Sequence, residues 1–89
     1  MKHASPGALD GLEPFLCELR TRAGLKEKSR GSFYRGSRAF LHFHEHGDEF
    51  YADIRLRGDF ERFPATTAAD HKTVLERIDA ALAARIKPR

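Results

Sequence analysis

Strand-forming residues between positions 31 and 66 alternate between apolar and polar, and glycines divide this stretch at regular intervals. Gly36, Gly47 and Gly58 lie eleven residues apart, and each is followed by Ser or Asp. A Gly before a small polar residue is typical of a type II′ hairpin turn, because only Gly takes a positive φ there without strain. We therefore predict a four-stranded antiparallel β-meander over residues 31–66, with three two-residue turns.

Two further segments have the apolar spacing of amphipathic helices. The first stripe follows i, i+3, i+4, i+7 spacing and consists of Leu12, Phe15, Leu16 and Leu19. It predicts a helix over 11–23, with Asp10 as N-cap. The second stripe consists of Val74, Leu75, Ile78, Leu82 and Ile86. It predicts a helix over 67–86, in which Thr67 and Asp70 form a capping box.

The resulting order is α-β-β-β-β-α, which predicts a single small α+β domain over residues 1–89. Both helices are expected on one face of the sheet, as a two-layer sandwich. Residues 1–8 are expected to form a loose tail. No apolar run is long enough for a signal-peptide core or a membrane span, and the single cysteine, Cys17, excludes an intrachain disulfide. A cytoplasmic domain without membrane contact is therefore expected.

The two-residue turns also fix which residues face each other across the strands. The predicted pairs are Arg35–Arg38, His46–Glu49, His44–Tyr51, His42–Asp53 and Arg57–Phe60. Period-two alternation then separates a helix-covered face from the side of the sheet turned away from the helices, here called the open face. The residues predicted on the open face and proposed to form a ligand site or interface are Phe33, Phe40, His42, His44, Tyr51, Asp53, Arg55 and Arg62.

A divalent metal ion is one predicted ligand of the open face. His42 and His44 lie on one side of a strand, roughly 6.5–7 Å apart, so their imidazoles can converge on one ion. The candidate carboxylate ligands are Asp53, predicted opposite His42, and Glu49, predicted opposite His46. Two His with a nearby carboxylate are a recurrent open metal site.

Two other roles use the aromatic and basic residues of the open face. Phe33, Phe40 and Phe60 would form an apolar patch rimmed by arginines, which favours self-association or binding of a protein partner. The same rings with Arg35, Arg38, Arg55, Arg57 and Arg62 resemble a stacking platform for single-stranded nucleic acid. Because the chain has no nucleophile–base arrangement, we expect a binding domain that acts as a homodimer or with a partner, and not an enzyme.

The element order over the whole chain resembles the small helix–sheet sandwiches of the frataxin and YjbR-like group. The resemblance rests on the segment from Gly31 to Thr67, with Ser32-Phe33-Tyr34 and Phe40-Leu41-His42-Phe43-His44. It implies the fold, and it implies no catalytic residue.

Overall fold

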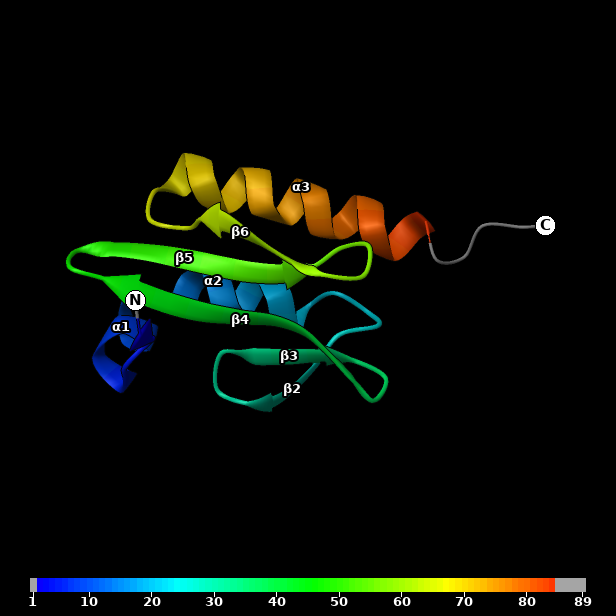
Figure 1. Ribbon diagram of the computed structural model, residues 1–89, viewed down its shortest axis with the longest axis horizontal. Helices are drawn as coiled ribbons and strands as arrows, with labels where there is room; N and C mark the ends of the chain where they lie inside the picture. Colours follow the sequence, from blue (N-terminus) through cyan, green and yellow to red (C-terminus); the bar gives the residue numbers. More distant parts are fainter. Residues whose placement is uncertain (1, 85–89) are drawn as a thin grey trace.

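The computed structural model describes residues 2–84 as one antiparallel sheet with three helices (Figure 1). The elements are β1 (Lys2–His3), α1 (Pro6–Gly11), α2 (Glu13–Arg20), β2 (Lys26–Ser29), β3 (Ser32–Arg35), β4 (Arg38–His46), β5 (Glu49–Arg55), β6 (Phe60–Pro64) and α3 (Ala68–Ala84). Strands β2 to β6 are neighbours in sequence order, and β1 pairs with β4. The α+β class and the meander are confirmed, but the sheet gains β2 and β1.

Helices α2 and α3 contribute to the same hydrophobic core. In Figure 1, α2 lies behind the sheet, whereas α3 runs beside β6. The buried helical side chains are Phe15, Leu16, Leu19, Val74 and Ile78, joined by Leu12 between α1 and α2. They pack against sheet residues Phe33, Phe40, Leu41, Phe43, Ala52 and Ile54. No helix within residues 2–84 is long and apolar enough to cross a membrane.

The start of α3 has the predicted capping box. The Asp70 N–H donates to the Thr67 hydroxyl at 3.0 Å, and the Thr67 N–H donates to the Asp70 carboxylate at 3.0 Å. These bonds satisfy two groups that the first helical turn would leave unpaired. The predicted end of this helix near Ile86 lies outside the described residues.

The prediction for the N-terminal region is wrong in two respects. The predicted loose tail over 1–8 is wrong for its described part, because residues 2–8 contain β1 and the start of α1, which Ser5 caps through the Ala8 N–H. The predicted helix over 11–23 is divided into α1 and α2 at Leu12. Pro14 has no N–H to donate to the carbonyl four residues earlier, so one helix cannot run through this point unbroken.

The register between β4 and β5 is as predicted. His42 lies opposite Asp53, His44 opposite Tyr51, and His46 opposite Glu49. The turns at Gly36 and Gly47 have φ of 60° and 61°, and within residues 2–84 no residue other than Gly has a positive φ, as a type II′ turn requires.

The register between β5 and β6 differs from the prediction by two residues. Arg55, and not Arg57, lies opposite Phe60, because the connection spans residues 56–59 in place of a two-residue turn. An even shift leaves each side chain on its predicted face. Arg62 therefore stays on the open face, and it moves to the position opposite Asp53.

A β-bulge between β3 and β4 reverses the predicted face of two aromatic residues. Tyr34 lies opposite Ala39, but Phe33 lies opposite Leu41, so Phe40 is an extra residue in β4. Phe33 and Phe40 are each only 1% exposed and belong to the core. Their placement on the open face was wrong, because burying each large apolar side chain is worth about 1.5–3 kcal/mol and regular alternation would have exposed both.

Candidate metal centre

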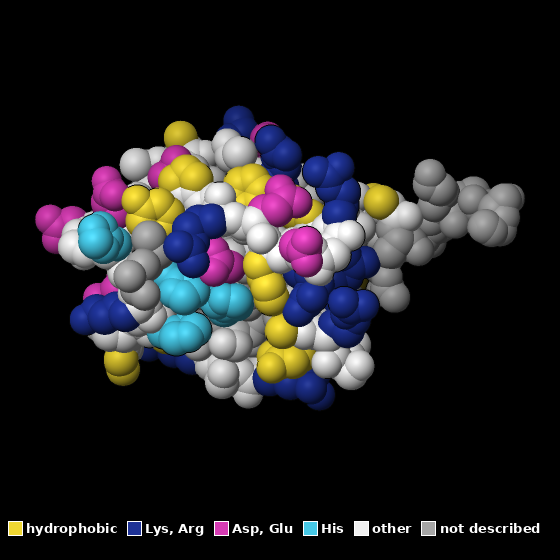
Figure 2. Space-filling model, viewed as in Figure 1, with side chains coloured by type: hydrophobic (Ala, Val, Ile, Leu, Met, Phe, Trp, Pro, Cys, Tyr) yellow, Lys and Arg dark blue, Asp and Glu magenta, His cyan; other side chains and the backbone are white. Residues whose placement is uncertain are grey.

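Two imidazoles of the open face converge on one carboxylate oxygen. His42 and His44 project from β4, and Asp53 projects from the neighbouring strand β5. The Nε2 atoms of His42 and His44 lie 3.4 Å and 3.2 Å from Oδ2 of Asp53. We call these three residues the His–Asp cluster; their ligand atoms all lie within 4.8 Å of one another. Figure 2 shows histidines gathered on this face beside an acidic and a basic side chain.

Strand β1 brings a third histidine against the cluster. His3 pairs with His44 in the sheet, and its ring stacks on the His44 ring with centroids 4.6 Å apart. The Ser5 N–H donates to the Glu45 carboxylate at 2.7 Å, which holds this segment on β4. Sequence reasoning missed His3, since a two-residue strand carries no alternation that could reveal it.

Arg62 neutralises the cluster from β6. Its Nε donates to Oδ1 of Asp53 at 2.7 Å, and its Nη2 donates to Oδ2 at 2.9 Å. This two-point contact lowers the pKa of the Asp53 carboxyl below its usual value, although burial opposes the shift. The Asp53 side chain is 11% exposed and that of Arg62 is 46% exposed, so the guanidinium can leave toward solvent more easily than the carboxylate.

Both imidazoles of the cluster favour their neutral form. Burial lowers the pKa of His42 and of His44, and the negative charge of Asp53 offsets part of this effect. Near neutral pH the cluster therefore consists of two neutral imidazoles and one carboxylate. Neutral imidazole and ionised carboxylate are the forms that coordinate metal ions.

The second ring nitrogen of His44 is poorly satisfied. Its Nδ1 is buried and has no hydrogen-bond partner among the described residues. A proton on Nε2, donated toward Asp53, leaves Nδ1 as an unpaired acceptor. With a metal ion on Nε2, the proton of the neutral ring would instead be on Nδ1.

Other predicted site residues lie around the cluster and not in it. The Glu49 carboxylate, predicted as a metal ligand, is not part of the His–Asp cluster. It accepts a hydrogen bond from the Tyr51 hydroxyl at 2.6 Å. The Arg55 guanidinium lies 4.4 Å from the centre of the Phe60 ring. The Phe60 ring in turn contacts His42, with centroids 4.9 Å apart, and is 37% exposed.

The predicted aromatic patch is not formed. Phe60 is exposed, but Phe33 and Phe40 lie in the core and cannot contact a partner or stack with a base. Self-association and nucleic-acid binding both depended on these rings. Both roles stay predictions, now without the aromatic platform that favoured them.

Comparison with protein-family models, with curated proteins and with solved structures gives no match to this chain. The resemblance to the frataxin and YjbR-like group therefore stays an expectation from element order, and function must be argued from the site.

Proposed function

We propose that this protein binds a divalent transition-metal ion, such as Zn²⁺, through Nε2 of His42, Nε2 of His44 and Oδ2 of Asp53. The supporting observation is the spacing of 3.4 Å and 3.2 Å between each Nε2 and the same carboxylate oxygen. In a tetrahedral zinc site with bonds of about 2.0–2.1 Å, neighbouring ligand atoms lie about 3.3 Å apart. An ion can therefore take its place among these atoms with little movement of the backbone.

The donor set favours zinc-like ions over magnesium or calcium. Two imidazole nitrogens with one carboxylate suit zinc, copper or nickel, whereas magnesium and calcium prefer sites made of oxygen atoms. Three protein ligands leave one tetrahedral position for water or for a group from a partner molecule. The His42 side chain is 27% exposed, so solvent reaches the cluster. We assign the protein a binding role, with no catalytic step.

Arg62 is the competitor of the metal ion in this proposal. Its guanidinium occupies both oxygens of Asp53, and its positive charge repels a second cation nearby. Arg62 must swing away for the ion to bind, which its exposed position on β6 allows. Replacing Arg62 by a neutral residue should therefore strengthen metal binding, a direction opposite to that expected of a residue that helps to hold the ion.

The test is zinc titration by calorimetry, on the wild type and on single variants. His44→Ala should weaken binding by more than about 100-fold, since loss of a ligand should exceed the 10–100-fold effect of losing a residue that only hydrogen-bonds to a ligand. Arg62→Gln should strengthen binding. His46→Ala is the matched control: it lies on the same strand and is exposed, but lies outside the cluster. Equal effects of His44→Ala and His46→Ala would contradict the proposal.

A further inference from the structure

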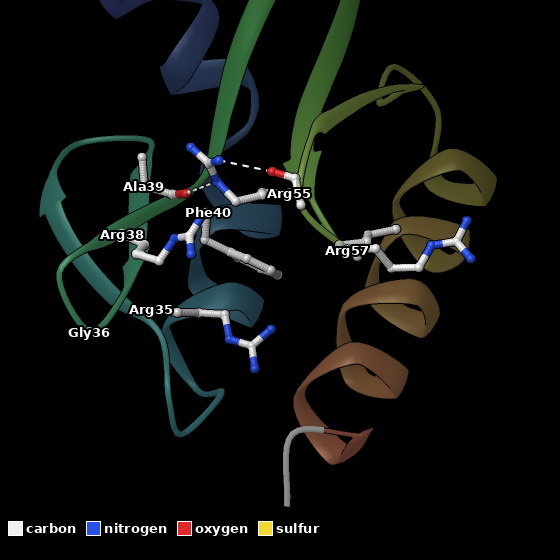
Figure 3. Close-up of a pocket in the computed structure, with 9 residues that line it drawn as sticks. Arg35, Gly36, Arg38, Ala39, Phe40, Arg55 and Arg57 are labelled. Atoms are coloured by element: carbon white, nitrogen blue, oxygen red, sulfur yellow. Dashed lines mark hydrogen bonds between the residues drawn. The ribbon is translucent and has the colours of Figure 1, made fainter.

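A second candidate site lies at the opposite end of β4 and β5 from the turn at Gly47. A hollow of about 430 Å³ opens between the β3–β4 hairpin and the loop that joins β5 to β6 (Figure 3). We call it the arginine pocket, after the basic residues that line it: Arg35, Arg38, Arg55 and Arg57. Its lining, drawn wholly from described residues, contains no acidic side chain.

The pocket forms where β4 and β5 no longer pair, at the start of β4 and the end of β5. Their pairing ends at Leu41 opposite Ile54, although β4 begins at Arg38 and β5 continues to Arg55. The bulge at Phe40 turns this ring into the core, and the loop over 56–59 lines the other side of the hollow. The hollow therefore lies between the bulge and the longer connection, the two places where the structure departs from the predicted hairpins.

Arg55 links the two sides of the pocket, which are the start of β4 and the loop between β5 and β6. Its Nε donates to the Ala39 carbonyl at 2.9 Å, and its Nη1 donates to the Gly58 carbonyl at 2.9 Å. These bonds are drawn as dashed lines in Figure 3. One guanidinium thus bridges the start of β4 and the β5–β6 loop, which gives the pocket a defined shape.

Two arginines of the pocket differ from several other arginines of the described chain in having no carboxylate partner. Outside the pocket, four arginines contact carboxylates at 2.5–3.1 Å: Arg20, Arg22, Arg30 and Arg62. No described residue forms an ion pair with Arg38 or Arg57. Like charges that line the same hollow repel each other, and an anion bound beside Arg38 would reduce that repulsion.

We propose that the arginine pocket binds the phosphate monoester group of a small phosphorylated molecule. Guanidinium groups give planar, two-point hydrogen bonds to phosphate oxygens, and several can address one tetrahedral anion. The volume lies within the roughly 300–1,000 Å³ typical of small-ligand sites, so the hollow suits a compact molecule. Because the Phe40 ring is 1% exposed, the pocket offers no open ring face for a row of stacked bases.

The side chains divide into inner and outer contacts. Figure 3 shows Arg38 and Arg35 reaching from the hairpin to the Phe40 ring, and the Arg35 guanidinium lies 5.2 Å from its centre. Arg57 extends in the same view away from them, over α3. Arg38 is therefore the main phosphate contact in the proposal, and Arg57 contributes only after its side chain turns inward.

The test is titration of the full-length protein with adenosine 5′-monophosphate, inorganic phosphate and an eight-residue oligothymidine at low salt. Arg38→Gln should weaken binding of the monophosphate about tenfold or more, since a charge-assisted contact is lost. Arg77→Gln is the control: it removes the same charge from an exposed site on α3, where the guanidinium contacts Phe63. It should change the affinity less than about twofold.

Three results would overturn the proposal. The first is an equal loss in Arg38→Gln and Arg77→Gln, which would mean general attraction to the net charge. The second is binding of the oligothymidine without any response to the monophosphate, which would indicate an extended nucleic-acid surface. The third is no binding of either phosphate compound by the wild type. Circular dichroism of both variants shows whether they keep the fold, and zinc affinity should be unchanged in both.

Discussion

The two ends of the paired strands β4 and β5 differ in how acidic and basic side chains are combined. In the His–Asp cluster, one carboxylate satisfies Arg62 and lies against two neutral imidazoles, so the site is compact and balanced. In the arginine pocket, four guanidinium groups line one hollow without an acidic side chain. In the two proposals, a cation binds at the first end by displacing one arginine, whereas an anion binds at the second end without displacing a carboxylate. The difference follows from pairing: the strands stay in register at the cluster and separate at the pocket.

The largest expected loss of stability concerns Phe40, the buried ring that lines the arginine pocket. Phe40→Ala should lower the free energy of unfolding by roughly 3–5 kcal/mol, because it removes a fully buried ring. Phe60→Ala, at an exposed ring near the cluster, should cost less than about 1 kcal/mol. Denaturant titration measures both. Similar losses would show that the bulge does not turn Phe40 inward, and the pocket would then lose its described shape.

A smaller loss of stability is expected from removing a paired charge in the His–Asp cluster, and almost none from removing one charge in the arginine pocket. Asp53→Asn removes the partner of Arg62 and should cost about 1–2 kcal/mol, a value kept low because the arginine is half exposed. Arg57→Gln removes one of several like charges and should change stability by less than about 0.5 kcal/mol. The measurement is again chemical unfolding, at low and high salt. A larger loss for Arg57→Gln than for Asp53→Asn would reverse the contrast between the two ends.

The smallest expected effect is a difference in pH dependence. The pKa values of His42 and His44 are lowered in the folded protein, so the unfolded chain binds protons more readily and stability should fall as the pH drops below about 6.5. The double variant His42→Gln/His44→Gln should flatten this slope. Arg38→Gln should leave it unchanged, since a guanidinium does not titrate in this range. Urea midpoints between about pH 7.5 and pH 5 test this, and an unaltered slope in the double variant would be the opposing result.

Regular alternation predicted the cluster because nothing interrupts the ladder there. The turn at Gly47 sets the register, and each later pair on β4 and β5 follows from it up to Leu41 and Ile54. The apolar residues Phe43 and Ala52 then fall on the buried face and His42, His44 and Asp53 on the open one. A correct turn and period-two alternation were enough to predict this part of the candidate site.

The pocket could not be predicted in the same way, because it depends on two irregularities. A bulge adds one residue and reverses every face beyond it, so Phe33 and Phe40 were assigned to the wrong side. The available signal was the large apolar side chain of each residue, which favours burial even where alternation predicts exposure. The role of His3 was equally hidden, because β1 is held by Glu45 and by pairing with β4 and not by any pattern of its own.

The most direct test of the central claim is to observe the histidine ring nitrogens by ¹⁵N NMR while zinc is added. The protein has five histidines, and the proposal assigns coordination to Nε2 of two of them. The Nε2 resonances of His42 and His44 should move together to the position of a metal-bound nitrogen, with saturation at one equivalent, while His46 and His71 stay unchanged. Shifts spread over all the histidines, or none at His42 and His44 at one equivalent, would contradict the claim that the His–Asp cluster is a metal site.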